Sequence, residues 1–194
     1  IAFLKSSGAI RSLRVETAFL AVDRSFFVSS SPYADKALQV LQGVTISQPS
    51  VVAEMLELLD VRHGQRVLDV GSGSGYTAAL SAKLVGSRGR VHSIDVNANA
   101  LALAKENVAK AGVNVFFKHA SGWSGVSRKK FDRILVSAAA ESIPKKLVDS
   151  LVEGGKMVLP LGTHPQEIVL LEKKNGGVQV SGSGIGVVFL RLVK

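Results

Sequence analysis

A glycine-rich loop set between a predicted strand and a predicted helix constrains the fold of this chain more than any other feature. The loop residues are Gly71, Ser72, Gly73 and Gly75. They directly follow the apolar segment 66–70 and precede the helix-forming segment 76–85, and glycines there allow a sharp turn and close approach of a ligand. Asp95 ends the next predicted strand at the spacing typical of an acid that binds both ribose hydroxyls. These features predict a site for a ligand that contains adenosine.

Strand-like and helix-like segments alternate along most of the chain, which predicts an α/β fold with a mostly parallel sheet covered on both faces. The predicted strands are 66–70, 90–95, 113–118, 131–136 and 156–161, and the predicted helices are 3–20, 49–60, 76–85, 98–112 and 143–151. The segment 43–49 is typical of a loop. Gly154 and Gly155 are typical of a turn that ends the preceding helix. The tail after residue 165 lacks a helical period, so we expect antiparallel strands there, with a hairpin turn at Asn175 and Gly176.

The residues around the glycine loop favour S-adenosylmethionine over a dinucleotide. A dinucleotide site prefers glycine or alanine at the sixth loop position, where this chain has Tyr76. Asp69 precedes the loop, and its charge would repel a pyrophosphate but suit a cationic sulfonium and ammonium. The sequence therefore predicts a Rossmann-like, class I S-adenosylmethionine-dependent methyltransferase fold, in which Asp69 lies beside the cofactor.

Length and composition fit one domain that spans 1–194, with a helical, substrate-side segment at 1–60 and the Rossmann-like core at 61–194. Hydrophobic residues make up 46% and charged residues 20%, as in a globular chain with a sizeable core. The chain has no cysteine, and its apolar runs are shorter than the roughly 20 residues of a membrane helix, so we expect a cytoplasmic protein. The four histidines lack ligand spacing, so no metal site is expected.

Residues and motifs that the chain lacks exclude or disfavour several classes of methyl acceptor. Methylation at carbon 5 of a pyrimidine needs a cysteine nucleophile, which is absent. Methylation of a base amine usually relies on an aspartate or asparagine followed by two prolines and an aromatic residue, whereas 137–140 here reads Ser-Ala-Ala-Ala. A carboxylate acceptor has a pKa of about 4 and needs no general base, so it suits this small, uncharged loop.

The order of its motifs gives the chain a resemblance to the protein-L-isoaspartate O-methyltransferase family over most of its length. The most specific match is Gly-Val-Thr-Ile-Ser-Gln-Pro at 43–49, followed by Val51, Val52, Ala53 and Met55. Supporting matches lie at 22–28, Tyr33, 131–132, 143–144 and 154–162. The resemblance implies methylation of the carboxylate of L-isoaspartyl residues in damaged proteins, which gives an ester that returns to aspartate through a succinimide.

The same resemblance assigns roles to individual residues. It makes Ser47 the active-site serine, which would orient the isoaspartyl carboxylate through its hydroxyl and not attack as a nucleophile. Thr45 and Ile46 would lie along the cofactor, Asp95 would hold the ribose and Val96 would flank the adenine. The alternative for Ser47 is a serine that caps the helix after Pro49.

Two motifs depart from the family pattern. Ala-Ser-Gly at 120–122 stands where the family has Gly-Asp-Gly, so Ser121 and Gly122 would lie near the adenine without a negative charge. Phe-Leu-Arg-Leu at 189–192 stands for the family's Phe-Val-Pro-Leu. Because the net charge is +9 and a basic triplet covers 128–130, two other functions remain open: a methyltransferase acting on RNA or a small molecule, and a non-catalytic homologue that binds nucleic acid.

Overall fold

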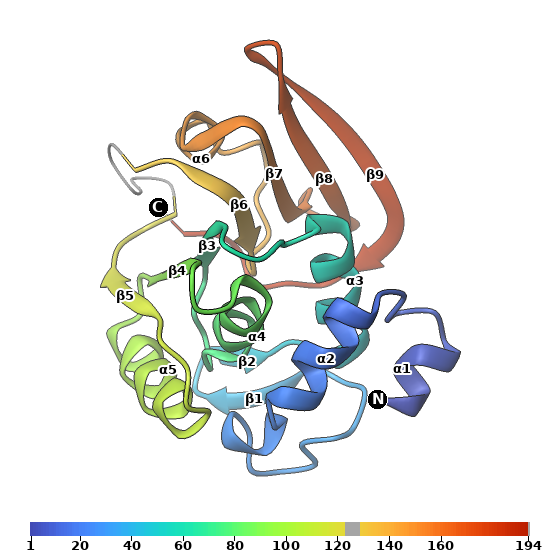
Figure 1. Ribbon diagram of the computed structural model, residues 1–194, viewed down its shortest axis with the longest axis vertical. Coiled ribbons are helices and arrows are strands. Elements are labelled where there is room, and N and C mark those ends of the chain that lie inside the picture. The colour runs from blue at the N-terminus through green and yellow to red at the C-terminus, as the bar shows by residue number, and fades with distance from the viewer. Residues whose placement is uncertain (123–128, 194) are drawn as a thin grey trace.

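The computed structural model describes residues 1–122 and 129–193, and its centre is a seven-stranded sheet (Figure 1). The strand order is β5-β4-β3-β6-β7-β8-β9. Neighbours from β5 to β7 run parallel, whereas β8 and β9 join antiparallel. The bounds are β3 Arg66–Val70, β4 Arg90–Asp95, β5 Phe116–His119, β6 Phe131–Val136, β7 Leu151–Leu161, β8 Gln166–Lys174 and β9 Gly177–Val187. The predicted α/β fold, with a mostly parallel sheet and antiparallel C-terminal strands, is confirmed.

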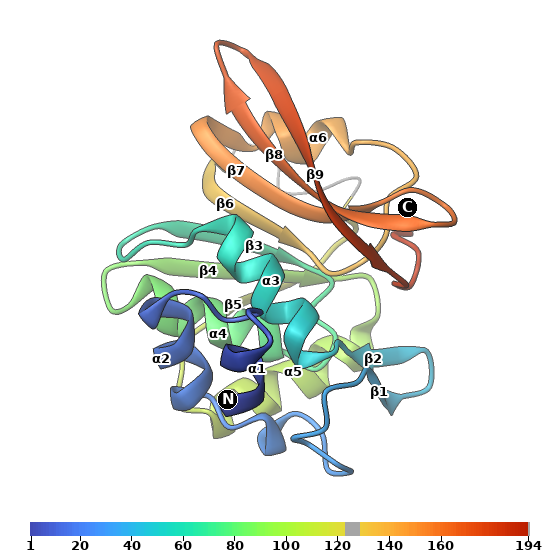
Figure 2. The same ribbon diagram turned by 90° about the vertical axis from the view of Figure 1, so that its right-hand side faces the viewer.

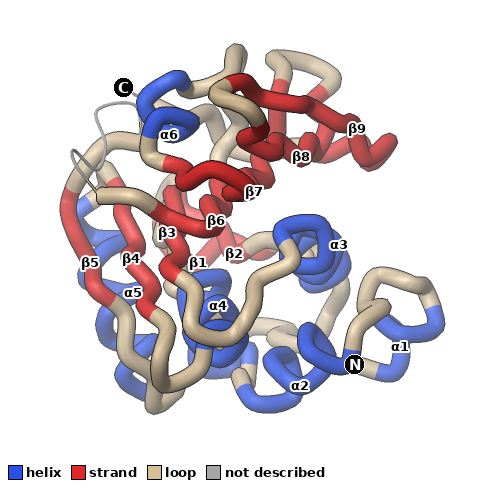
Figure 3. Tube along the Cα trace, turned by 45° about the horizontal axis from the view of Figure 1, so that its top comes forward, coloured by secondary structure: helices blue, strands red, loops and turns tan. Residues whose placement is uncertain are grey.

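Helices cover the two faces of the sheet unequally (Figures 2 and 3). One apolar cluster packs the larger helical layer, whereas a second cluster lies between the other face and the short α6. The helices are α1 Ala2–Ser6, α2 Leu13–Ala21, α3 Pro49–Leu59, α4 Tyr76–Val85, α5 Ala98–Lys110 and α6 Lys145–Asp149, with a 3-10 turn at Arg24–Phe26. In residues 1–122 and 129–193, no helix has the length and apolar character needed to cross a membrane.

The N-terminal segment differs from its prediction in two places. The expected helix 3–20 is divided into α1 and α2, because Gly8 adopts a φ of +80° and Ser12 caps the second helix by accepting from the Val15 amide. The expected loop 43–49 contains strand β2, Val44–Ile46, which pairs antiparallel with β1, Leu38–Leu41. This hairpin lies beside the glycine loop, since a β carbon on Gly73 would come within 3.4 Å of the Thr45 main-chain oxygen.

Three boundaries in the second half also needed correction. Helix α6 is shorter than the predicted 143–151, since it begins only after Pro144. Gly154 and Gly155 lie inside β7 and do not form a stop and turn. Strand β5 covers Phe116–His119 and not 113–118. By contrast the hairpin between β8 and β9 is confirmed, since Asn175 and Gly176 adopt φ values of +54° and +75°.

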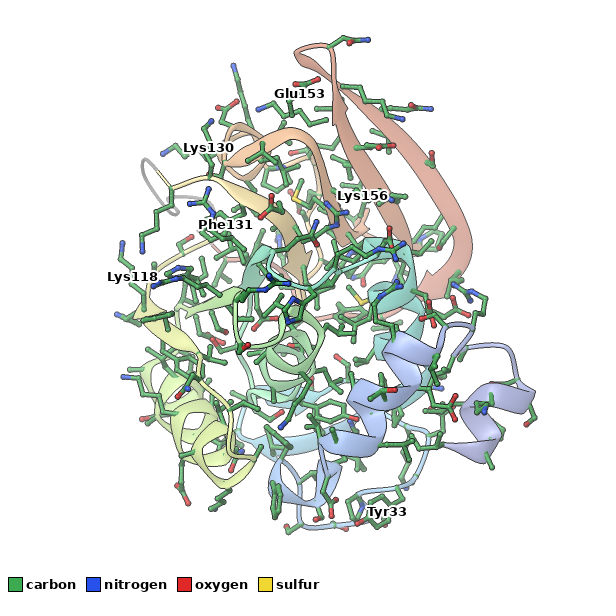
Figure 4. All side chains as sticks on the ribbon, viewed as in Figure 1. Tyr33, Lys118, Lys130, Phe131, Glu153 and Lys156 are labelled. Carbon is green, nitrogen blue, oxygen red and sulfur yellow. The ribbon has the colours of Figure 1, made fainter. Side chains whose placement is uncertain are left out.

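Asp60 links the N-terminal helices to the sheet. It ends α3 in the left-handed conformation, and its Oδ1 accepts from Arg14 Nη2 at 2.7 Å and pairs with Arg62 Nη2 at 2.8 Å. Lys156 of β7, which is labelled near the middle of Figure 4, lies 3.8 Å from Oδ2. The Asp60 main-chain oxygen accepts from Arg133 Nε of β6 at 3.1 Å. Because α3 follows the β1–β2 hairpin directly, these contacts also fix the hairpin relative to the sheet.

Candidate active site

A cleft of about 950 Å³ opens at the carboxyl ends of β3, β4 and β6. Parallel α/β sheets bind ligands at this edge, where the strand order reverses. The described residues that line the cleft come mainly from 43–48, 70–77, 94–97, 137–138 and 186–193. The glycine loop, the β1–β2 hairpin and the chain's C-terminal residues therefore share one site.

Gly71 and Gly73 let the loop form the floor of the cleft. Their φ values are +88° and +51°, which other residues rarely adopt. A β carbon placed on Gly73 would lie 3.4 Å from the main-chain oxygen of Thr45, so the hairpin packs closely over the loop. Two motifs that are 26 residues apart, counted from Ser47 to Gly73, thus meet at the floor of one cleft.

Gly75 has a different function from the one predicted. It does not line the cleft, and a β carbon on it would lie 2.9 Å from the Ala104 main-chain oxygen and 3.0 Å from Val108 Cγ2. Its φ is +89° at the N-cap of α4. Glycine at this position therefore allows α4 to begin against α5, and the predicted cofactor contact is corrected to a packing role.

Asp95 combines a structural role with a free side of its carboxylate. Its Oδ2 accepts from the Gly73 amide at 3.0 Å, and its Oδ1 accepts from the Asn97 amide at 2.8 Å. The residue is half-buried and lines the cleft. Because each carboxylate oxygen has two lone pairs, one pair on each remains for a hydroxyl group. The geometry fits the predicted hydrogen bonds to two ribose hydroxyls.

Asp69 is fully buried beneath the loop and does not line the cleft, so the prediction that it lies against the cofactor is wrong. Its Oδ1 accepts from Thr77 Oγ1 at 2.8 Å and its Oδ2 from Ser93 Oγ at 2.6 Å. Ser93 in turn lies 2.7 Å from Ser72 Oγ. Burial raises the pKa of Asp69 from 3.8 to about 6, against the lowering effect of the Ser93 and Thr77 hydrogen bonds. Asp69 therefore positions the loop from below.

Tyr76 explains why the sixth loop position is not glycine. Its ring packs against Phe19 and Phe27 at centroid distances of 6.1 and 5.3 Å, and Arg24 Cζ lies 5.1 Å from its centroid. Burial raises the pKa of Tyr76 to about 12, although Arg24 opposes this rise. Since Tyr76 also lines the cleft, its ring connects the N-terminal segment to the floor of the site.

The hairpin places Thr45, Ile46 and Ser47 along one wall of the cleft. Ile46 is buried in the larger apolar cluster, whereas Ser47 is half-buried. The N-cap of α3 is Gln48, whose own side chain does not cap the helix; instead Asp35 Oδ1 accepts from the Ser50 amide in the first turn at 2.8 Å. Gln48 Nε2 donates to Asp35 Oδ2 at 3.0 Å, which holds the turn after Ser47. The alternative role of Ser47 as a helix cap is therefore wrong.

Residues 187–193, here called the C-terminal strap, form the opposite wall and were not predicted as site residues. The Gln166 side chain clamps Phe189: its Oε1 accepts from the Phe189 amide at 2.6 Å and its Nε2 donates to the Phe189 oxygen at 3.2 Å. The Ala139 amide donates to the Leu190 oxygen and the Leu192 amide to the Ala139 oxygen, both at 2.8 Å. The unusual Phe-Leu-Arg-Leu ending was the available sequence signal for this wall.

Three predicted residues remain: Val96, Ser121 and Gly122. Val96 and Gly122 line the cleft, and a β carbon on Gly122 would lie 2.6 Å from Val70 Cγ1. Ser121 does not line it, and its Oγ donates to the Val193 oxygen at 3.1 Å. Its place beside the cofactor stays a prediction, since its neighbours Ala120 and Gly122 both line the cleft.

The basic triplet lies away from the cleft where it can be placed. Arg128 lies outside the described residues, and neither Lys129 nor Lys130 lines the cleft. Lys130, labelled beside Phe131 in Figure 4, donates through Nζ to the Asp149 main-chain oxygen. Within 1–122 and 129–193, no cluster of three acidic or histidine side chains could hold a metal ion.

The cleft fits an adenosine ligand without phosphates. Asp95 is the only Asp or Glu among the described lining residues, and Arg191 on the strap is the only Lys or Arg. The glycine loop thus faces a carboxylate and no neighbouring cation, which suits ribose and a positively charged sulfur better than a pyrophosphate.

Comparison with known proteins agrees with this geometry. Residues 1–194 match the family model for protein-L-isoaspartate(D-aspartate) O-methyltransferase. The chain belongs to this family. Its members are S-adenosylmethionine-dependent O-methyltransferases, so the chain is an enzyme of that class and takes S-adenosylmethionine as its cofactor.

Individual relatives place the match over nearly the whole chain. The protein-L-isoaspartate O-methyltransferase of Pyrococcus horikoshii is 39% identical over 202 residues, which cover 100% of this chain and 90% of the relative. That of Methanopyrus kandleri is 44% identical over 182 residues, or 90% of this chain and 80% of the relative. The crystal structure of the Plasmodium falciparum family member with S-adenosyl-L-homocysteine superposes with a TM-score of 0.91 at 29% identity, covering 99% and 95% of the two chains.

Proposed function

We propose that this isoaspartyl methyltransferase uses the glycine loop, Asp95 and the β1–β2 hairpin to hold S-adenosylmethionine, and Ser47 to orient the isoaspartyl carboxylate. The enzyme transfers a methyl group to L-isoaspartyl residues of damaged polypeptides, the reaction that begins their repair. The observation that carries the residue roles is the contact between Thr45 and Gly73, because it brings the family's most specific motif onto the cofactor loop.

The chain's own residues would bind the cofactor along one side of the cleft. The two free lone pairs of Asp95 would accept the ribose hydroxyls, while Val96 and Gly122 would flank the adenine. Gly71 and Gly73, without side chains, would allow the methionine part to lie against the loop. Thr45 and Ile46 would cover it from the hairpin. S-adenosylmethionine supplies, when bound, a methyl group on a positively charged sulfur.

The acceptor needs orientation more than activation. A carboxylate is already ionised at neutral pH, so no residue has to remove a proton from it. Ser47 stands on the hairpin beside Thr45, and its hydroxyl would donate to one carboxylate oxygen and leave the other in line with the methyl group. Ser137 and Ala138, on the wall between the loop and the strap, offer no competing charge.

The decisive experiment compares two peptides of identical sequence, one with L-isoaspartate and one with L-aspartate at the same position. We expect transfer of labelled methyl from S-adenosylmethionine to the first peptide and almost none to the second. Equal labelling of both, or of neither while S-adenosylhomocysteine still binds, would overturn the acceptor assignment. The single-domain organisation and the cytoplasmic location expected from composition stay predictions, which limited proteolysis and cell fractionation would test.

A further inference from the structure

Among the described residues, Arg191 on the strap carries the only fixed positive charge that lines the cleft. Among the described lining residues, the side chains that can ionise are Asp95, Tyr76, His164 and Arg191. Asp95 and Tyr76 are engaged at the floor. Arg191 lies on the strap, and its side chain is 71% exposed. For an anionic ligand group at this wall, Arg191 is therefore the one lysine or arginine partner that the described lining offers.

Arg191 is held beside the loop that follows β6. Gly71 on the floor lies against Ser137, since a β carbon there would be 3.6 Å from the Ser137 main chain. The Arg191 side chain forms an ion pair with Glu141, four residues after Ser137 in the same loop. The Arg191 backbone forms an isolated parallel β-bridge with Ala139. The guanidinium is therefore held beside the loop after β6 with most of its surface exposed, where a side chain of a bound polypeptide can reach it.

The strap is both apolar and fixed. Val188 is 82% exposed and Leu190 53% exposed, and they stand two residues apart on an extended segment that lines the cleft. Apolar side chains exposed together at a cleft commonly mark a surface that another polypeptide covers. Between them Phe189 is clamped by Gln166, so the rim is a held edge and not a loose tail.

We propose that the strap is a docking rim that selects polypeptide acceptors with an acidic side chain beside the isoaspartyl residue, and that Arg191 binds this acid. The inference rests on the proposed function. Glu141 is 48% exposed, and an ion pair between exposed side chains is weak, so a substrate carboxylate can share or replace Glu141 at little cost. Val188 and Leu190 supply the apolar contact that holds the polypeptide against the rim.

The test uses isoaspartyl peptides that differ only in one flanking residue: Glu, Gln or Lys, placed at each of the two positions on either side of the isoaspartate. At one position at least, we expect kcat/KM to be about twofold to fivefold higher with Glu than with Gln, and lower again with Lys. The difference should lie in KM, because docking precedes the transfer. It should disappear in 1 M salt, where charges are screened beyond about 3 Å.

Variants then assign the preference. Arg191→Gln should bring the Glu to Gln ratio close to one, Arg191→Lys should restore most of it, and Glu141→Gln should increase it by removing the competing carboxylate. Lys105→Gln, an equal charge change on the helical layer at an exposed site outside the cleft, should leave the ratio unchanged.

Failure of this inference is distinguishable from failure of the proposed function. If none of the peptides is methylated, the function fails. If the wild-type enzyme methylates Glu, Gln and Lys peptides equally at all four positions, the function stands and the docking rim is wrong. If Arg191→Gln lowers activity with every peptide by the same factor and keeps the ratio, Arg191 serves only the structure or the reacting carboxylate, and the proposed selection is equally overturned.

Discussion

The backbone amide of Gly73 donates a hydrogen bond of 3.0 Å to Oδ2 of Asp95. The residue predicted to bind ribose therefore also fixes the loop on which the methionine part of the cofactor would lie. A charged hydrogen bond of this kind is stronger than a neutral one and orients the carboxylate before any ligand arrives. Loop and acid thus act as one unit, although 22 residues separate them in the sequence.

Asp95→Asn is expected to weaken S-adenosylhomocysteine binding by roughly tenfold to 100-fold. Asparagine has one acceptor oxygen, so either the Gly73 or the Asn97 amide loses its partner, and ribose loses a charged acceptor; such a loss costs about 1.5–3 kcal/mol. Titration calorimetry measures the Kd. Asp149→Asn, which removes an exposed carboxylate outside the cleft, is the matched control. An Asp95→Asn affinity within twofold of the wild type would contradict the assignment.

Gly75→Ala should destabilise the fold and not specifically the cofactor site. Alanine at a φ of +89° is strained, and its β carbon would press on Ala104 and Val108 of α5. Gly112→Ala provides the control, because its φ is +61° but nothing lies within 4 Å. Backbone strain lowers the stability of both variants. Overpacking against α5 should lower the free energy of unfolding of Gly75→Ala by roughly 1–3 kcal/mol more than that of Gly112→Ala. Urea unfolding measures the difference, and equal midpoints would show that α5 moves aside freely.

Ser47→Ala should reduce kcat/KM for an isoaspartyl peptide by roughly tenfold to 100-fold, the value of one hydrogen bond to a charged group. The affinity for S-adenosylhomocysteine should stay within about twofold. Stability should also be unchanged, because Gln48 and not Ser47 occupies the N-cap of α3. A variant with lower stability and normal turnover would return Ser47 to a purely structural role.

Asp69 should make the protein less stable as the pH rises from about 4 to about 6. Burial raises its pKa in the folded state to about 6, against 3.8 for the exposed group, so in this window the folded state binds the extra proton. Stability then falls with rising pH, by at most about 3 kcal/mol. Asp69→Asn removes this titration, so its unfolding free energy should lack this fall between pH 4 and 6. Urea unfolding at several pH values measures it, and an unchanged slope would argue against a raised pKa.

The predicted site residues that the structure brings together in one cleft are those encoded by local spacing. Gly71, Gly73 and Asp95 follow neighbouring strands whose carboxyl ends must meet at one edge of a parallel sheet. It was harder to predict from the sequence which face of the sheet a side chain points to. Asp69 alternates with Leu68 and Val70, so it faces α4 and Thr77, and the period of two along β3 could have indicated this.

Other features depended on contacts between distant segments. Gly75 looks like the other loop glycines in sequence, and only the position of α5 shows that it serves packing. The strap joins Phe189 to Gln166 and Leu190 to Ala139, so its place over the cleft follows from pairings that no local pattern encodes. The β1–β2 hairpin was missed because its strands are only four and three residues long.

Gln166→Glu tests whether the clamp on Phe189 holds the acceptor wall. The new carboxylate can still accept from the Phe189 amide but cannot donate to the Phe189 oxygen, so two acceptors would face each other at a site where Gln166 is only 8% exposed. We expect faster hydrogen exchange over 187–193 and a KM for isoaspartyl peptides raised several-fold, with a smaller change in S-adenosylhomocysteine affinity. Gln179→Glu makes the same charge change at an exposed position on β9 and should alter neither. Unchanged exchange in the strap would mean that its bonds to Ala139 suffice, and that the rim does not depend on Gln166.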